Sequence, residues 1–225
     1  SFNNNARLPP IGTFNTMRIV CISDTHSMHR QIQVPDGDLL IHAGDCLGVE
    51  TLDELEDLDR WFSELPHRNK ILIAGNHDWC FQDEPAEARE LVRNAHYLQD
   101  SPVELEGLKF WGSPWTPVFF NWAFNLERGD ALAERWARIP EDTDVLITHG
   151  PPAGIRDKID SPTGIIRPGC EALAERVASL TLKLHIFGHI HEDHGREQIG
   201  DCLYVNASTC NGSFKPLNPP IVIDL

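Results

Sequence analysis

The sequence predicts a layered α/β domain, and three observations carry this prediction. Short apolar runs rich in β-branched residues recur along the 225 residues, most of these runs are continuously apolar, and segments compatible with helices lie between them. Continuous apolarity is typical of strands covered on both faces, and alternation of strands with helices favours layered α/β folds. The sequence contains no internal repeat or low-complexity linker, so we expect one domain over residues 17–225.

The strands are predicted where the apolar runs occur, and the helices between them. In chain order the predicted strands cover 17–23, 38–44, 70–75, a hairpin over 103–113, 144–149, 183–189, 202–208 and 220–224. The predicted helices cover 51–65, 85–94, 127–138 and 170–180. Thr51 and Glu54 open the first helix with the spacing of a capping box, and the third helix stops before Pro140. Strands follow one another closely in the second half, so we expect mixed pairing.

The composition is typical of a soluble globular chain. Hydrophobic residues make up 41% and charged residues 24%, and no apolar run approaches the length that spans a bilayer. We expect residues 1–16 to be a flexible tail. Because these residues lack the apolar stretch of a secretory signal, we expect the protein to be cytoplasmic. The six cysteines are scattered without a CxxC pair, as is typical of reduced, buried thiols.

The charge of the chain bears on its partners. The formal net charge is −15 and the pI about 5.0. A nucleic-acid polymer requires a basic surface, so this balance argues against such a partner. We expect a small phosphate-ester substrate and no membrane, and the sequence leaves the oligomeric state open.

Metal-ligating side chains follow several of the predicted strands. The segments concerned are Asp24-Thr25-His26, Gly44-Asp45, Gly75-Asn76-His77-Asp78, His149-Gly150 and Gly188-His189-Ile190-His191. In α/β sheets the carboxyl ends of strands converge on one edge, where loops gather side chains from distant parts of the sequence. A single Asp-x-His or Gly-Asp pair is usually a turn or a helix cap, but their combination at successive strand ends indicates one shared site.

The donor types indicate a pair of divalent cations. Two cations about 3.5–4 Å apart need several oxygen and nitrogen donors and one bridging carboxylate. The candidate donors are the carboxylates of Asp24 and Asp45, the amide of Asn76, and the imidazoles of His26, His149, His189 and His191. Carboxylate and imidazole ligation without thiolate favours Mn²⁺, Fe or Zn²⁺ over Ca²⁺, and Mn²⁺ is the ion we expect first.

The motifs, in this order, resemble those of the calcineurin-like metallophosphoesterase superfamily, whose pattern is D-x-H, G-D, G-N-H-[DE], H and G-H-x-H. The resemblance covers residues from about 17 to 210. The chain is most similar to the small metallophosphoesterase-domain (MPPED) branch, through WGSPWTP and WAFN within 111–125, HGPP at 149–152, Gly169-Cys170 and VNASTCN at 205–211. The resemblance implies a four-layer α-β-β-α sandwich of two mixed sheets flanked by helices, with the metal site at strand carboxyl ends.

The resemblance also assigns the ligands to two metals. By the superfamily pattern, one metal is held by Asp24, His26 and His191 and the other by Asn76, His149 and His189, with Asp45 bridging them. The ligand set is complete in this chain, which favours an active enzyme over a binding scaffold.

Two neighbouring residues are implied to take part in catalysis. His77 would contact the substrate phosphate or protonate the leaving oxygen, and Asp78 would orient His77. The implied reaction is attack of a metal-bridged hydroxide on a phosphodiester, with small or cyclic nucleotides as the expected substrates.

Several alternatives stay open at this stage. A phosphomonoesterase or protein phosphatase could use the same site, and a non-catalytic metal-binding interaction scaffold could use the same fold. The aromatic stretch 111–125 is either a loop packed over the core or an aromatic wall beside the substrate, and the loop 206–211 is expected near the base or leaving group. Lys158 and Arg167 could meet a phosphate or be exposed solubilising charges.

Overall fold

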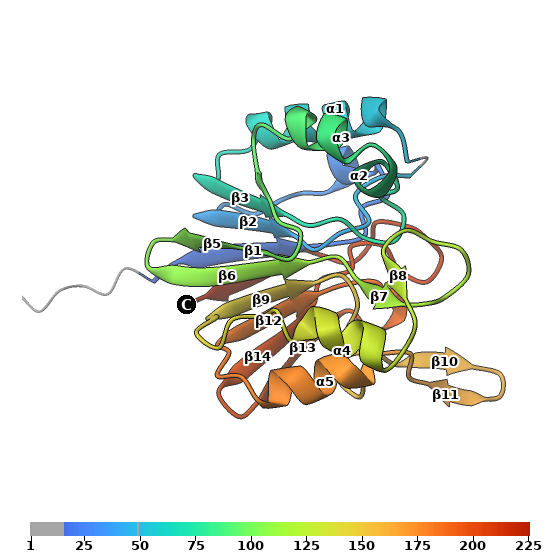
Figure 1. The fold of residues 1–225 in the computed structure, drawn as a ribbon. Coiled ribbons are helices and arrows are strands. Elements are labelled where there is room, and N and C mark those ends of the chain that lie inside the picture. Colours follow the sequence, from blue (N-terminus) through green and yellow to red (C-terminus); the bar gives the residue numbers. More distant parts are fainter. Residues whose placement is uncertain (1–15, 49) are drawn as a thin grey trace, which may run out of the picture.

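Two β-sheets lie face to face at the centre of the molecule, and helices cover the outer face of each (Figure 1). The computed structural model describes residues 16–48 and 50–225. The expected tail therefore lies outside the described residues, apart from Thr16.

The first sheet has the strand order β15-β1-β2-β3-β4. Its strands are β1 (Arg18–Ile22), β2 (Leu39–His42), β3 (Asn69–Leu72), β4 (His96–Tyr97) and β15 (Ile221–Asp224). The pairs β1–β2, β2–β3 and β3–β4 are parallel, whereas β15 runs antiparallel to β1. The last strand of the chain thus pairs with the first.

The second sheet has the order β13-β14-β12-β9-β6-β5. Its strands are β5 (Ser101–Leu105), β6 (Leu108–Ser113), β9 (Val145–Thr148), β12 (Leu184–Phe187), β13 (Gly195–Ile199) and β14 (Cys202–Asn206). The four inner strands are parallel, and antiparallel neighbours β5 and β13 flank them at the edges. Both sheets are therefore mixed, as expected.

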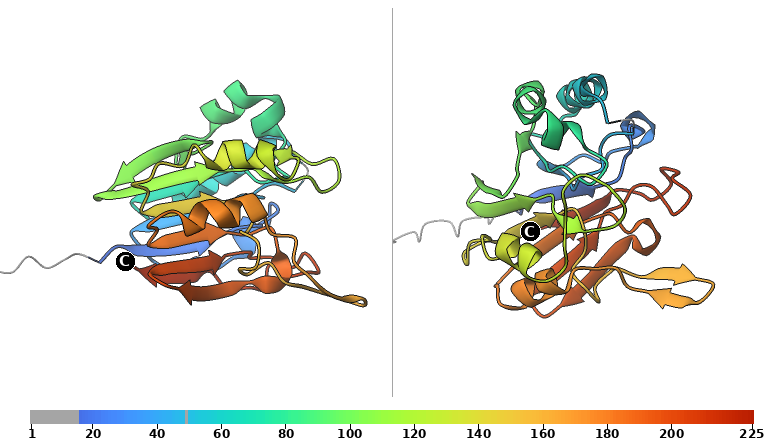
Figure 2. Two further views of the ribbon diagram at one scale, coloured as in Figure 1. Left: turned by 60° about the horizontal axis from the view of Figure 1, so that its bottom comes forward. Right: turned by 45° about the vertical axis from the view of Figure 1, so that its right-hand side comes forward.

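Three apolar layers hold the sheets and helices together. The central layer fills the space between the sheets and includes Ile19, Ile41 and Ile73 from the first and Val145 and Ile186 from the second. A second layer joins the first sheet to α1 (Leu52–Glu64), α2 (Cys80–Asp83) and α3 (Pro85–Leu91). A third joins the second sheet to α4 (Asp130–Trp136) and α5 (Glu171–Ala178). The expected four-layer α-β-β-α sandwich is confirmed (Figure 2).

Every predicted strand and helix is present, and each predicted helix is shorter than expected. Helix α1 carries the expected capping box: Thr51 accepts a hydrogen bond from the amide of Glu54, and the Glu54 carboxylate accepts one from the amide of Thr51. Helix α4 begins at Asp130 rather than 127, because Gly129 has a φ of 89° and no residue of a right-handed helix adopts that conformation.

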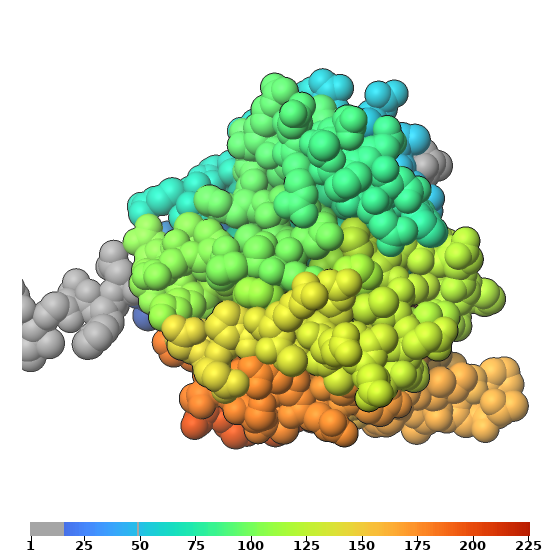
Figure 3. All heavy atoms as spheres, viewed as in Figure 1, coloured from blue at the N-terminus to red at the C-terminus, as the bar shows by residue number. Residues whose placement is uncertain are grey.

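The sequence did not predict several short elements. They are α2, β4, β13, the parallel pair β7 (Thr116–Pro117) and β8 (Asn125–Leu126), and the hairpin of β10 (Ile159–Ser161) and β11 (Gly164–Ile166). The pair β7–β8 closes the ends of the aromatic loop between them. The β10–β11 hairpin projects from the body of the molecule at lower right (Figure 3). Within the described residues, no helix has both the length and the apolarity needed to cross a bilayer.

Candidate metal centre

The loops after five strands of the two sheets meet at one edge of the sandwich. These strands are β1, β2, β3, β9 and β12, and the motif side chains follow them directly. Three groups of candidate ligands have donor atoms within 4.8 Å of one another: Asp24, His26 and His191; His26, Asp45 and His77; and Asp45, His149 and His189. The structure therefore brings the motif residues into one continuous cluster, at the place where the sequence predicted it.

Sharp turns place the ligands at this edge. Asp24, His26, Asp45 and His189 all have positive φ, between 42° and 69°, a conformation that costs a non-glycine residue about 1–2 kcal/mol. Such strain commonly collects at functional sites.

Two motif glycines are required because the ligands approach the backbone closely. A Cβ on Gly188 would lie 2.1 Å from Oδ2 of Asp24, and a Cβ on Gly75 would lie 2.2 Å from Oδ1 of Asp45. No side chain fits at such distances, so each glycine makes room for a ligand carboxylate.

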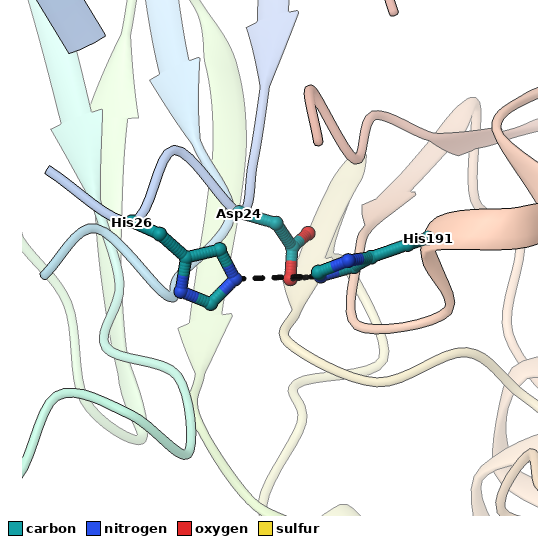
Figure 4. Close-up of side chains that lie close together, drawn as sticks. All are labelled: Asp24, His26 and His191. Atoms are coloured by element: carbon teal, nitrogen blue, oxygen red, sulfur yellow. Dashed lines mark hydrogen bonds and ion pairs between the residues drawn. The ribbon is translucent and has the colours of Figure 1, made fainter. Parts of the chain in front are cut away.

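The first half of the site joins the loop after β1 to the short turn after β12. Figure 4 shows the side chains of Asp24, His26 and His191 pointing toward one another. Nε2 of His191 lies 3.3 Å from Oδ1 of Asp24 and 3.4 Å from Nε2 of His26. Asp24 is fully buried and accepts hydrogen bonds from the Ser208 hydroxyl at 2.8 Å and from the His189 amide at 3.0 Å. These contacts fix the carboxylate without closing its face toward the histidines.

The second half of the site gathers around His149, which is fully buried. Its Nε2 lies 2.9 Å from Oδ1 of Asn76 and 3.2 Å from Oδ1 of Asp45. The ring of His189 contacts the His149 ring edge-on, with centroids 5.1 Å apart.

Asp45 links the two halves. Its Oδ1 lies beside His149 in the second half, and its Oδ2 lies 3.9 Å from Nε2 of His26 in the first. The amide of His77 donates to Oδ1 at 2.8 Å and so fixes the carboxylate. A carboxylate with one oxygen toward each donor group has the arrangement required of a bridging ligand.

The residues present fit a pair of divalent cations. Nδ1 of His149 donates to the carbonyl oxygen of Ala43 at 2.9 Å, so Nε2 is the nitrogen that His149 would offer to a cation, beside Oδ1 of Asn76 and Oδ1 of Asp45. Nδ1 of His191 lies 3.3 Å from the carbonyl oxygen of Asn211, which leaves its Nε2 facing Asp24 and His26. Cations could replace the protons that lie between these donor atoms in the metal-free site, and backbone carbonyls commonly orient metal-binding imidazoles in this way.

The buried charges support the same interpretation. Burial alone would raise the pKa of Asp24, but the hydrogen bond and charge of His191 hold it below its usual value. Burial likewise opposes ionisation of Asp45, and the charge of His149 nevertheless holds the pKa of that carboxyl well down. Burial would lower the pKa of His149, but the Asp45 carboxylate raises it to about 9. Both carboxylates therefore stay ionised, and in the metal-free site protons on His149 and His191 hold the places that cations would take.

His77 lies at the rim of the cluster, half-buried. Its ring contacts the His26 ring edge-on at a centroid distance of 4.9 Å and lies against the tilted ring of Trp122 at 3.9 Å. Its Nδ1 lies 3.9 Å from a carboxylate oxygen of Glu50. His77 is thus directed toward the ligands and is open enough to meet a substrate.

Asp78 does not take the place that the sequence suggested. Its fully buried carboxylate accepts hydrogen bonds from the amides of Gly75 at 2.7 Å, Leu47 at 3.0 Å and Cys46 at 3.3 Å. Burial, followed by the charge of Asp45, raises the pKa of Asp78 to about 7. Among the described residues, none of its hydrogen bonds reaches His77. The side chain ties the Asp45 loop to the Asn76 loop, because successive residues of this turn point in different directions.

The three tryptophans of the aromatic stretch divide between the core and the site. Trp111 is 7% exposed and packs under α4 and α5, and the indole N–H of Trp115 donates to Asp100 at 2.8 Å. Trp122 alone of these three contacts a motif residue. The aromatic-wall hypothesis therefore holds for Trp122, and core packing explains the other two.

The two basic residues considered for phosphate binding are engaged elsewhere. Arg167 donates to the fully buried carboxylate of Asp157 at 2.7 Å, and Lys158 pairs with Asp160 at 3.1 Å. Exposed, solubilising charge therefore describes these two residues better than phosphate binding. Glu50 and Phe214 also contact motif residues, and no sequence pattern pointed to them. Ser208 and Asn211, which contact Asp24 and His191, belong to the loop 206–211 that the resemblance had placed near the substrate.

Comparisons with known proteins agree with this site. The calcineurin-like phosphoesterase family profile matches residues 17–193. Human metallophosphoesterase domain-containing protein 1 is 44% identical over 232 residues, which cover 92% of this chain and 71% of that protein. A UPF0046 protein of Caenorhabditis elegans is 37% identical over 95% of this chain and 77% of its own length.

A solved structure shows the same fold. Phosphopantetheinyl hydrolase (PptH) from Mycobacterium tuberculosis superposes with a TM-score of 0.62 and covers 94% of this chain and 97% of its own. Its 16% sequence identity restricts the likeness to the fold. The residues matched by the family profile include all seven candidate ligands. The similarity to the human protein confirms the resemblance to the small metallophosphoesterase-domain branch. This chain belongs to the calcineurin-like phosphoesterase family, whose members are metal-dependent phosphoric ester hydrolases.

Proposed function

We propose that this protein is a dinuclear-metal phosphodiesterase that acts on small phosphate esters, with small or cyclic nucleotides as the expected substrates. The placement of Asp45 carries the proposal: one of its oxygens faces the His149 group and the other faces His26. The first metal would be held by Asp24, His26 and His191, the second by Asn76, His149 and His189, with Asp45 between them.

When bound, the two metals, for which we favour Mn²⁺ over Fe or Zn²⁺, would supply an activated water and stabilise charge on the phosphoryl oxygens. The water oxygen forms a bond to phosphorus, the bond from phosphorus to the leaving oxygen breaks, and the leaving oxygen takes up a proton. His77 is placed to give that proton, since it lies against His26 at the rim of the ligand cluster. Trp122 holds its ring in place.

The charges around the site favour a diester over a monoester. A monoester dianion carries one more negative charge than a diester, and such groups are commonly bound by arginine or lysine. Within residues 16–48 and 50–225, no lysine or arginine side chain forms an ion pair or hydrogen bond with Asp24 or Asp45.

The cysteines are all free and buried, which supports the proposed cytoplasmic location, a reducing compartment.

A metal-reconstituted substrate panel tests the proposal. Metal-free protein should be inactive and Mn²⁺ should restore hydrolysis of bis(4-nitrophenyl) phosphate and of 2′,3′- or 3′,5′-cyclic AMP, with 4-nitrophenyl phosphate cleaved more slowly. His77→Asn should lower kcat by about 100-fold or more while the protein keeps its metal. Faster cleavage of the monoester would favour the phosphomonoesterase alternative. Turnover that survives complete removal of metal would exclude the proposed reaction.

A further inference from the structure

Phe214 is an exposed aromatic residue at the edge of the metal centre. Its side chain is 57% exposed, yet its ring contacts two candidate ligands: the ring of His191 at a centroid distance of 4.9 Å and the ring of His26 at 5.3 Å. Both contacts are edge-on, with interplanar angles of 73° and 61°. One part of the ring thus covers the ligands, while the rest is open to solvent.

The backbone of Phe214 is held in an unfavourable conformation. Its φ of 54° lies in the left-handed region, which costs a non-glycine residue about 1–2 kcal/mol. An exposed phenylalanine gains little from burial that would offset this cost. Backbone strain that is not offset by burial of the side chain is typical of functional residues.

Asn211 fixes Phe214 relative to the metal centre. Its carbonyl oxygen accepts from the amide of Phe214 at 2.8 Å and lies 3.3 Å from Nδ1 of His191. Its side-chain oxygen accepts from the amides of Ser213 at 3.0 Å and Lys215 at 3.2 Å, which closes the turn around Phe214. One residue therefore orients a candidate ligand and the exposed ring together.

Phe214 and Trp122 lie at different ends of one row of rings. Trp122 contacts His77, His77 contacts His26, and His26 contacts Phe214. The proposed proton donor and its tryptophan thus occupy one side of His26, and Phe214 adds an apolar ring that is not needed to position His77. Planar groups stack favourably on such exposed rings, and this stacking is largely independent of hydrogen bonding.

We propose that Phe214 is a specificity-determining residue, whose open ring receives the planar group of a phosphate ester such as a nucleobase or an aryl substituent. The proposal deepens the proposed function and rests on it for the identity of the site. Phe214 takes no part in proton transfer or in metal ligation. It raises the affinity for esters with a planar substituent over esters that carry only a sugar or an alkyl chain.

Binding measurements on the Mn²⁺-loaded protein test this role without turnover. Adenosine 5′-monophosphate and ribose 5-phosphate share the phosphate and the sugar and differ in the base. We expect the wild-type protein to bind the nucleotide about tenfold more tightly, as single-base stacking on an aromatic ring would give. Phe214→Ala should bring the two dissociation constants within about twofold, by weakening the nucleotide and leaving ribose 5-phosphate unchanged.

Further variants separate the ring from the loop that carries it. Phe214→Trp should retain the preference and Phe214→Leu should lose it, because only the former keeps a stacking surface. Phe214→Gly should lose the preference without loss of thermal stability, because glycine tolerates the positive φ. Leu217→Ala in the same segment and Phe119→Ala in the aromatic loop are matched controls, 69% and 61% exposed in the parent chain, and both should keep the preference.

The outcomes distinguish this role from the proposed function. A base preference unchanged in Phe214→Ala, or no preference in the wild type, overturns the role of Phe214 even if the protein hydrolyses phosphodiesters. If the metal-loaded protein binds neither compound and hydrolyses no ester, both proposals fall together. Equal weakening of both compounds in Phe214→Ala would show that Phe214 only supports the metal site and would likewise overturn the role.

Discussion

The indole ring of Trp122 lies against the imidazole ring of His77, with their centroids 3.9 Å apart and their planes inclined by 42°. This contact joins the loop between β7 and β8 to the loop after β3. It explains why Trp122 stays half-buried at the rim of the metal centre, whereas Trp111 packs under α4 and α5. The position of His77 therefore depends on a residue far from it in the sequence.

Removing the Trp122 ring should lower turnover without emptying the metal site. Ring contacts of this kind contribute about 0.5–1.5 kcal/mol, so Trp122→Ala should reduce kcat up to about tenfold, because His77 is positioned less well. Trp122→Phe should restore most of the loss. Metal content and kcat measured together would check this; a loss of metal in Trp122→Ala would mean that the ring supports the ligands rather than His77.

The Ser208 hydroxyl should raise metal affinity through Asp24. Ser208 donates to Oδ2 of Asp24 at 2.8 Å, and removal of such a supporting hydrogen bond weakens metal binding by about 10–100-fold. We expect Ser208→Ala to bind Mn²⁺ more weakly by that factor, as measured by calorimetric titration. The neighbouring Thr209 is a matched control, because its buried hydroxyl has no hydrogen-bond partner among the described residues. Thr209→Val should keep the wild-type affinity; equal weakening in both variants would contradict the role of Ser208.

Asp78 should contribute to stability and His77 to activity. Asp78→Ala leaves the buried amides of Gly75 and Leu47 without their acceptor, which should lower the free energy of unfolding by about 2–4 kcal/mol. His77→Asn should lower that free energy by no more than about 1.5 kcal/mol, because only ring contacts at the rim are lost. Urea unfolding of metal-free protein measures both. A stable Asp78→Ala protein that loses activity as His77→Asn does would restore Asp78 as a catalytic partner.

His185 should make the protein sensitive to acid. Its Nε2 lies 2.8 Å from the Thr148 hydroxyl, which itself donates to the Gly150 carbonyl, so Nε2 carries the proton and the buried Nδ1 has no partner among the described residues. Burial lowers the pKa of His185 from 6.5 to about 3. The folded protein thus binds fewer protons than the unfolded chain, and this contribution to stability, complete above pH 6.5, is lost as the pH falls toward 3.

The glutamine variant isolates this effect. A histidine whose pKa is lowered by folding reduces the free energy of unfolding by about 1.4 kcal/mol for each unit that the pH falls between the pKa of the unfolded chain and that of the folded protein. His185→Gln keeps a donor for Thr148 and does not titrate, so its stability should fall less steeply between pH 6 and pH 5 by about that amount. Urea unfolding of metal-free protein at the two pH values gives the slopes. Identical slopes for the variant and the wild type would show that His185 is not the source.

Strand positions were predictable because buried strands must be apolar. The inner strands β1, β9 and β12 are covered on both faces and are therefore almost entirely apolar, with few polar residues such as His185. Strand β13, with the sequence GREQI, was not predicted because it lies at an edge and is mostly exposed. The β10–β11 hairpin was likewise not predicted, because its residues are mostly exposed.

The ligands were predictable because carboxylate, amide and imidazole groups have little reason to follow one buried strand after another. Their supports were not, since the carbonyl oxygens of Ala43 and Asn211 could come from any residue type. Asp78 was assigned to His77 because they are adjacent in the sequence, whereas the turn directs them apart. Phe214 belongs to no pattern, and only the fold brings it to His26 and His191.

The number of metal ions bound by one chain tests the two-site centre most directly. Metal-free protein titrated with Mn²⁺ and followed by calorimetry and elemental analysis should bind two ions per chain, as the ligand groups that share Asp45 require. Asn76→Ala should bind one ion, because it lacks a ligand of the second group and leaves Asp24, His26 and His191 intact. A wild-type protein that saturates with a single ion, or an Asn76→Ala protein that still binds two, would contradict the dinuclear centre.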